Sequence, residues 1–243
     1  VEVVNEPLHD PPSQPGSGGG NYLEALGGTG TTGWDWILNA FRLARTHFPN
    51  TKLLINEYGI LNSSSDLNRY LSIVDLLKAE DLIDGIGVQA HAFTTSNASV
   101  ATLKWTLDRL RETGLPVQVT ELDVDGLSDA VQLQEYQRIF PAIWEHPAVA
   151  GVTLWGWRPG MWRTQQGAPL VTSGGVNRPS MDWLSDYLAA VLASDEDDIE
   201  LPARNGLLSV YPNPVEARTT LEFALATPGA VRLSIHDVLG RQL

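Results

Sequence analysis

Residues 116–124 read Pro-Val-Gln-Val-Thr-Glu-Leu-Asp-Val, a short run rich in β-branched residues that ends in two carboxylates. Apolar and polar residues alternate along it, which is typical of a β-strand. Apolar residues at helical spacing follow directly, at Val131, Tyr136, Ile139 and Ile143. A strand followed at once by an amphipathic helix is the βα unit from which parallel sheets are built.

The same unit recurs along most of the chain. We expect strands at residues 1–5, 52–56, 85–90, 116–121 and 151–155. Each is followed by apolar residues three and four apart, which predict helices at about 34–48, 67–77, 100–110, 131–143 and 181–191. Five consecutive βα units fit either most of a TIM barrel or a doubly wound sheet.

The composition excludes several classes of function. The 243 residues carry a formal net charge of −13, which would repel nucleic acid and anionic membranes at long range. There is no cysteine, and therefore neither a disulfide nor a thiolate metal site. No stretch is apolar for long enough to predict a membrane span. A neutral substrate fits this chain best, and we expect neither a metal nor a cofactor.

Three segments differ from the βα repeat. Residues 10–33 are crowded with Gly, Pro, Ser and Thr, which is typical of a functional or mobile loop at a barrel mouth. An acidic run at 194–206 predicts a linker, and the alternating pattern with Pro-rich turns at 207–243 predicts a small, partial all-β sandwich. We therefore expect a barrel part at 1–193, a linker at 194–206 and a tail domain at 207–243.

Two glutamates lie where the predicted strands end. Glu6 closes the first strand and Glu121 the fourth, and in a closed barrel these strand ends face one another across the mouth. Two facing carboxylates are what glycoside hydrolysis requires, one to protonate the leaving oxygen and one to attack or to activate water. Each glutamate alone could equally be an exposed loop residue.

Polar and aromatic neighbours support the interpretation of Glu6 and Glu121 as a catalytic pair. Asp123 shares the side of Glu121, and His91 ends the preceding strand, so the three can form a hydrogen-bonded chain that keeps Glu121 ionised. Gln89 shares the side of His91. Indole rings that could stack on sugars crowd the last strand exit, at Trp155, Trp157 and Trp162, although core packing could claim at least one of them.

Five segments together resemble the fourth to eighth strands of the glycoside hydrolase family ten xylanases. In order and spacing they are Asn5-Glu6-Pro7, Ile55-Asn56-Glu57-Tyr58, residues 85–91, residues 120–124 and Trp155-Gly156. Asn-Glu-Pro recurs throughout the wider clan of barrel glycosidases, whereas the whole set is specific. The resemblance covers about residues 1–193 and implies a partial TIM (β/α)8 barrel with strands four to eight visible.

The resemblance also implies a role for each matching residue. Glu6 would be the acid/base, Glu121 the nucleophile and Asn5 the donor to the 2-hydroxyl of the reacting sugar. Polar support around Glu121 would come from Gln89, His91 and Asp123. The remaining substrate-binding or supporting residues would be Tyr58, Trp155 as the floor of the reacting sugar's subsite, and Trp162 closing over it.

The chain departs from the family pattern in two main places. Family members commonly carry Asn-Asp-Tyr-Asn where this chain has Asn56-Glu57-Tyr58-Gly59, so we interpret Glu57 as a supporting residue. No segment corresponds to the first three strands, which supply half of the substrate cleft. We therefore expect the 243-residue chain, expressed alone, not to hydrolyse xylan, because its sheet edges stay open and remote binding is lost.

The expected function is that of a retaining endo-1,4-β-xylanase, which hydrolyses internal bonds of xylan or xylo-oligosaccharides by double displacement. A β-1,4-glucanase or mannanase of the same clan is an alternative. A non-catalytic glycan-binding surface protein is another, and the intact Glu6, His91, Glu121 and Asp123 count against it.

The tail resembles a second known family. Its segments 208–214, 219–223 and 231–241 are similar to the C-terminal sorting domain of bacterial type IX secretion substrates. That resemblance implies a secreted or cell-surface protein whose tail is recognised by the secretion machinery. A carbohydrate-binding or fibronectin-like module is the alternative.

Overall fold

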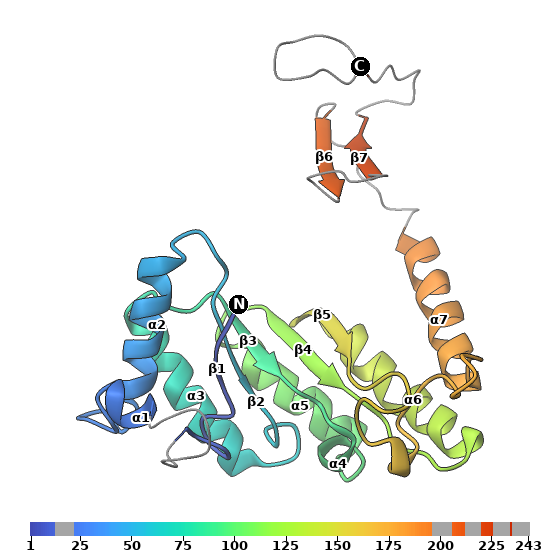
Figure 1. The fold of residues 1–243 in the computed structure, drawn as a ribbon, viewed down its shortest axis with the longest axis horizontal. Helices are drawn as coiled ribbons and strands as arrows, with labels where there is room; N and C mark the ends of the chain where they lie inside the picture. The colour runs from blue at the N-terminus through green and yellow to red at the C-terminus, as the bar shows by residue number, and fades with distance from the viewer. Residues whose placement is uncertain (13–21, 196–205, 212–219, 226–233, 235–243) are drawn as a thin grey trace. The chain divides into compact units, whose positions relative to one another are not determined.

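The computed structural model describes residues 1–12, 22–195, 206–211, 220–225 and 234. It divides into two compact units, Val1–Asp186 and Tyr187–Leu243. The first unit holds a five-stranded parallel sheet with its helices (Figure 1). In the described part of the second unit, β6 (Gly206–Tyr211) pairs with β7 (Thr220–Ala224) in antiparallel fashion. None of the described helices combines the length and apolar character needed to cross a bilayer.

The strands of the sheet lie in the order in which they occur along the chain. All neighbours are parallel, and the order β1-β2-β3-β4-β5 has no reversal. A doubly wound sheet would reverse its strand order at a switch point, whereas a barrel adds each strand next to the last. The sheet is therefore part of a TIM barrel, with strands β1 (Glu2–Asn5), β2 (Leu54–Glu57), β3 (Gly85–Val88), β4 (Val117–Leu122) and β5 (Val149–Leu154).

One face of this sheet is covered by helices, as Figure 1 shows. Neighbouring helices contact in sequence, α2 with α3, α3 with α5 and α5 with α6. Serine side chains cap three of them by accepting a hydrogen bond from the backbone of the first turn, which satisfies a free N–H. The helices are α1 (Tyr22–Ala25), α2 (Asp35–His47), α3 (Ser64–Ala79), α4 (Ala92–Thr95), α5 (Val100–Arg111), α6 (Asp129–Trp144) and α7 (Pro179–Asp195), with the 3-10 turn η1 (Thr164–Gln166).

All five predicted strands and their helices are present, with bounds that differ by a few residues. The strand predicted for 85–90 ends at Val88, because Ala90 takes a left-handed conformation with φ 62°. Phe48 and Val131, predicted to face the core, are exposed because they lie at or beyond the ends of their helices. The short helices α1 and α4 were not predicted. A strand expected at 230–235 falls outside the described residues, except for Ser234.

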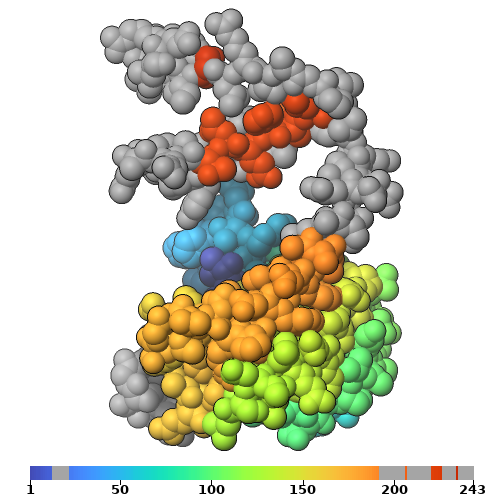
Figure 2. Space-filling view, turned by 90° about the vertical axis from the view of Figure 1, so that its right-hand side faces the viewer, coloured from blue at the N-terminus to red at the C-terminus, as the bar shows by residue number. Residues whose placement is uncertain are grey.

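The long loop after β5 is fastened to α6 and to Gly126, which precedes it, by polar contacts. Gln132 Nε2 donates to the carbonyls of Gly167 and Ala168, both at 2.9 Å. Arg178 donates to Gly126 O at 2.8 Å and to Pro169 O at 2.8 Å. Figure 2 shows this face, where yellow-green atoms of α6 adjoin the yellow and orange atoms that follow β5. The loop that carries Trp162 is therefore held against the barrel wall.

Candidate active site

The hydrogen-bond ladder of the sheet continues beyond the ends of the strands. Glu6 N donates to Asn56 O at 2.9 Å, Gln89 N to Glu57 O at 3.0 Å, and Glu121 N to Gln89 O at 3.0 Å. In a parallel sheet such a ladder brings the carboxyl ends of successive strands to one edge. The side chains that follow β1, β2 and β3 therefore meet those at the end of β4.

Side-chain amides link the two candidate carboxylates. Gln89 Nε2 donates to Glu6 Oε1 at 2.7 Å and to Asn5 Oδ1 at 3.2 Å. Asn56 Nδ2 donates to the same Asn5 oxygen and to Glu121 Oε1, both at 2.9 Å. Glu6 and Glu121 thus belong to one hydrogen-bonded network at the mouth of the sheet.

Glu121 is supported on its other side by a histidine and an aspartate. Its Oε2 lies 3.4 Å from His91 Nε2, and His91 Nδ1 lies 2.5 Å from Asp123 Oδ2. Asp123 is fully buried and also accepts from Ala92 N at 3.0 Å. Burial opposes a positive charge on His91, but the hydrogen bonds to Asp123 and Glu121 outweigh it and raise the pKa of His91 to about 9. His91 is therefore an imidazolium that lies between the carboxylates of Asp123 and Glu121.

Glu6 differs from Glu121 in its backbone conformation. Its φ is 54°, in the left-handed region that costs a non-glycine residue of order 1–3 kcal/mol. The ladder bond from Glu6 N to Asn56 O and a turn bond from Asp10 N to Glu6 O, both 2.9 Å, hold this conformation. Strained backbone maintained by its surroundings is a feature that clusters at active sites.

Aromatic rings flank the histidine. The Trp162 and Phe93 rings each lie 5.2 Å from the His91 ring, and Trp162 Nε1 donates to Asp123 Oδ2 at 2.9 Å. Tyr58 meets Phe93 edge to face at 5.8 Å. Burial and the nearby Glu6 charge raise the pKa of the Tyr58 hydroxyl.

The structure therefore gathers most of the residues singled out in the sequence. Trp155 is 43% exposed, and its backbone N donates to Leu122 O. It stays at the strand exit without a ring contact to the cluster among the described residues. The residues brought together are Asn5, Glu6, Tyr58, Gln89, His91, Glu121, Asp123 and Trp162.

Asn56 is the central residue that sequence reasoning left without a role. Its amide lies between Asn5 and Glu121, and its Oδ1 accepts from Thr120 Oγ1 at 2.8 Å. In the structure Asn56 pairs in register with Asn5 on the neighbouring strand, which brings its amide into the network. Gly87 makes room for it, since a Cβ there would lie 2.6 Å from Asn56 Oδ1.

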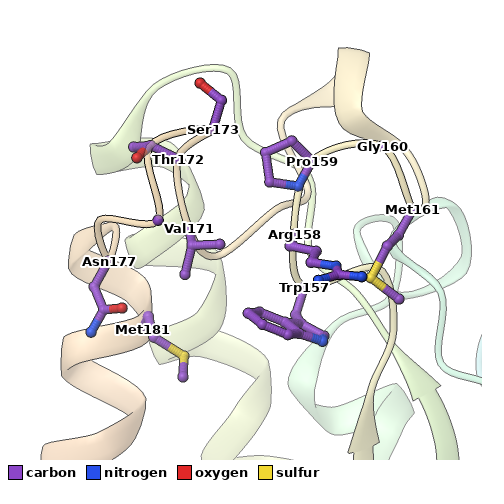
Figure 3. Close-up of a pocket in the computed structure, with 11 residues that line it drawn as sticks. Trp157, Arg158, Pro159, Gly160, Met161, Val171, Thr172, Ser173, Asn177 and Met181 are labelled. Atoms are coloured by element: carbon purple, nitrogen blue, oxygen red, sulfur yellow. The ribbon is translucent and has the colours of Figure 1, made fainter.

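A surface hollow of about 680 Å³ lies beside the loop after β5. Figure 3 shows the Trp157 ring and the Met181 side chain on its floor, with Arg158 and Asn177 at its sides. Its lining includes none of the residues in the carboxylate network. The candidate active site is therefore assigned by the hydrogen-bonded carboxylates and not by the size of the hollow.

Comparison with known proteins agrees with this geometry. The model of the family described as glycosyl hydrolase family 10 matches residues 1–186. The chain belongs to glycosyl hydrolase family 10. A curated relative, endo-1,4-beta-xylanase B of Cellvibrio japonicus, is 35% identical over 192 residues, which are 77% of this chain and 29% of that protein.

Solved structures of the same family share the fold. A GH10 protein from Paenibacillus barcinonensis superposes with a TM-score of 0.61 at 26% identity, over 77% of this chain and 61% of that one. An intracellular xylanase of Thermoanaerobacterium saccharolyticum, a mutant in complex with xylotriose, gives 0.59 at 28% identity, over 73% and 55%. This family 10 chain thus spans under two thirds of the length of each of these relatives.

Proposed function

We propose that the protein is a retaining endo-1,4-β-xylanase in which Glu121 is the nucleophile and Glu6 the acid/base. One observation carries the proposal. The network through Gln89, Asn5 and Asn56 joins two carboxylates at the mouth of a family 10 barrel. Retaining glycosidases need such a pair, one on each side of the scissile bond.

In the proposed reaction Glu121 attacks the anomeric carbon while protonated Glu6 gives its proton to the leaving oxygen. The bond to the leaving sugar breaks and a glycosyl-Glu121 ester forms. Glu6, now ionised, takes a proton from water, which attacks the same carbon and releases the sugar with its original anomeric configuration. The proton balance closes because Glu6 ends protonated and Glu121 ends ionised.

The environment of each residue suits its proposed role. Glu121 receives Asn56 Nδ2 and lies beside the His91 imidazolium, and both interactions stabilise the charged form that attacks carbon. Glu6 keeps one hydrogen bond from the neutral amide of Gln89. Asn5, whose Oδ1 is occupied by two donors, would present its Nδ2 to the sugar's 2-hydroxyl.

Xylan is proposed as the substrate on the strength of the relatives. The Cellvibrio japonicus relative carries the name endo-1,4-beta-xylanase, and the Thermoanaerobacterium saccharolyticum structure holds xylotriose. A pyranose offers flat C–H faces to aromatic rings, and Trp155 and Trp162 are 43% and 38% exposed near the carboxylates.

The test is a substrate panel applied to the protein expressed from its complete reading frame. Reducing-sugar release is measured on xylan, mannan and soluble cellulose, and proton NMR follows the anomer formed first. We expect release from xylan above the other two and initial formation of the β-anomer. Release from glucan or mannan instead would overturn the substrate, and initial formation of the α-anomer would overturn double displacement.

We further propose that residues 207–243 form a type IX secretion sorting domain that directs a secreted or cell-surface location. The sequence resemblance at 208–214, 219–223 and 231–241 supports this, and most of these residues lie outside the described ones. The antiparallel pair β6–β7 is compatible with an all-β module. In a bacterial host with this pathway, deletion of 207–243 should retain the activity inside the cell. Unchanged export would contradict the assignment.

A further inference from the structure

Glu57 is a completely buried carboxylate next to the proposed active site. It is the last residue of β2, and its side chain is 0% exposed. An ionised carboxylate in such a place is unstable unless donors surround it. Glu57 has three: Oε2 accepts from Leu8 N at 2.7 Å, and Oε1 accepts from Tyr58 N at 2.8 Å and from His9 Nδ1 at 3.0 Å.

Two of these donors belong to the turn that follows Glu6. Leu8 is two residues and His9 three residues beyond Glu6, and Asp10 N closes the turn on Glu6 O at 2.9 Å. Glu57 therefore fixes the first residues after a backbone that is in the left-handed region at Glu6. We call residues 6–10 the acid turn.

A second layer holds the histidine in place. His9 Nε2 lies 3.5 Å from Asp66 Oδ2 in α3, and the His9 ring stacks on Tyr58 at 4.3 Å. The third side is closed by Gly59, where a Cβ would lie 3.2 Å from His9 Cε1. The ring has contacts on several sides, so the Nδ1 bond to Glu57 has a fixed direction.

Burial raises the pKa of the Glu57 carboxyl above its ordinary value, and the donors from His9, Leu8 and Tyr58 offset only part of that rise. The hydrogen bonds from Leu8 and His9 thus stabilise the buried Glu57 carboxylate, and the same bonds hold the acid turn in place. A side chain that only filled space here would need no such set of donors. Two of the three contacts are to Leu8 and His9, which lie in the chain just after Glu6.

We propose that Glu57 is a positioning residue for Glu6, acting through the acid turn and locked by His9. The proposal rests on the proposed role of Glu6 as the acid. The Glu57 side chain is completely buried, and its hydrogen bonds run to Leu8, His9 and Tyr58 and not to Glu6, but it decides where the Glu6 carboxyl stands relative to the leaving oxygen. Proton donation depends steeply on such placement, and general acid catalysis contributes about 10²- to 10⁴-fold.

The experiment measures leaving-group dependence in Glu57→Gln, with the protein expressed from its complete reading frame. Gln keeps the size of the side chain but replaces one acceptor oxygen with a donor, so the hydrogen bonds that this oxygen accepted are lost. With aryl xylobiosides whose phenol is strongly acidic, glycosylation needs no proton, and we expect kcat/KM, which reports that step, to stay within about twofold of wild type. With weakly acidic phenols and with xylan, we expect kcat/KM to fall about tenfold or more. Equal losses for all leaving groups, or no loss, would overturn the proposal.

Matched variants keep the result decisive. Glu80→Gln makes the same chemical change in an ion pair with Arg42 on the helical side and should leave the whole series unchanged. If Glu57→Gln fails to fold, His9→Ala removes one donor and leaves two, and thermal unfolding shows whether it is native. We expect the same selective loss, only smaller, and a loss independent of the leaving group would overturn the proposal.

Failure of the proposed function would be recognised separately. If wild type cleaves another β-1,4-glycan and not xylan, the substrate assignment fails. The same series with aryl glycosides of that sugar then still tests Glu57. Absence of any glycosidase activity in wild type would overturn both.

Discussion

The end of β4 and the end of β1 each present a glutamate to the same site, yet they hold it in different ways. Glu121 is held through its side chain, by Asn56 and by His91, which Asp123 supports. Glu6 is held mainly through its backbone, in a left-handed conformation next to a turn fastened by Glu57. At the end of β4, Glu121, His91 and Asp123 form a charged hydrogen-bond relay. At the end of β1, Glu6 begins a strained turn.

The contrast matches two chemical requirements. A nucleophile must be ionised at rest, and a neighbouring imidazolium and an amide donor provide for that. An acid/base must gain and lose a proton in every cycle, so its surroundings should fix its position without binding one protonation state tightly. Side-chain electrostatics would keep the nucleophile Glu121 ionised. Backbone geometry would hold the acid/base Glu6 in position.

Removal of the Glu121 carboxylate should have the largest effect. Glu121→Ala should lower hydrolysis about 10⁴-fold or more, because no other group can form the ester. In wild type, mass spectrometry after treatment with a 2-deoxy-2-fluoro xylobioside should find the label on Glu121. Label on Glu6 or Glu57 instead would contradict the assignment of Glu121 as the nucleophile.

Removal of the Glu6 carboxyl should be more selective. Glu6→Ala should lower activity on xylan by about 10² to 10⁴ and retain more activity on aryl glycosides with a good leaving group, since these need no proton. The kcat/KM values on the two substrates give the ratio, because kcat/KM reports the glycosylation step and not the later attack of water. Equal losses on both would show that Glu6 is not the acid.

A smaller loss is expected when the relay behind Glu121 is weakened. Asp123→Asn removes the charge that holds His91, and a hydrogen bond to a charged group contributes about 1.5–3 kcal/mol, or about ten- to a hundredfold in rate. Turnover should fall by that factor in protein that thermal unfolding shows to be still folded, and the thermal midpoint should fall as well because the buried His91 loses its charged partner. Unchanged turnover would make Asp123 a purely structural residue.

The relay should also make stability depend on pH. The folded pKa of His91, about 9, lies above the ordinary value of 6.5. Its contribution is therefore complete below about pH 6.5 and is lost as pH rises through about 9. Urea unfolding should show wild type losing more than about 1 kcal/mol over this range relative to His91→Gln. The same pH dependence in both proteins would show that His91 is not charged.

The smallest effect should come from the indole that joins the relay. Trp162→Phe keeps a ring beside His91 but removes the N–H that donates to Asp123 Oδ2. One hydrogen bond contributes about 1 kcal/mol, so kcat should fall about fivefold. A loss as large as that of Asp123→Asn would mean that Trp162 acts mainly on the sugar.

Much of this protein was predictable from local patterns. The alternation of strand and helix periods identified every βα unit of the first domain, because burial on a sheet or a helix face requires that spacing. The ends of the strands predicted where Glu6, His91, Glu121 and Asp123 would meet, because a parallel sheet brings its carboxyl ends to one edge.

Other features depend on contacts between segments far apart in the chain. Periodicity left a barrel and a doubly wound sheet both open. The resemblance to family ten predicted the barrel, and the strand order of the structure confirms it. The roles of Asn56, Glu57 and His9 came from side chains that meet across β1 and β2. The amino-acid sequence by itself determined the βα units and the chemistry available at their ends. Only the tertiary structure decided which donors surround each carboxylate, because hydrogen bonds form between atoms that are close in space and not in sequence.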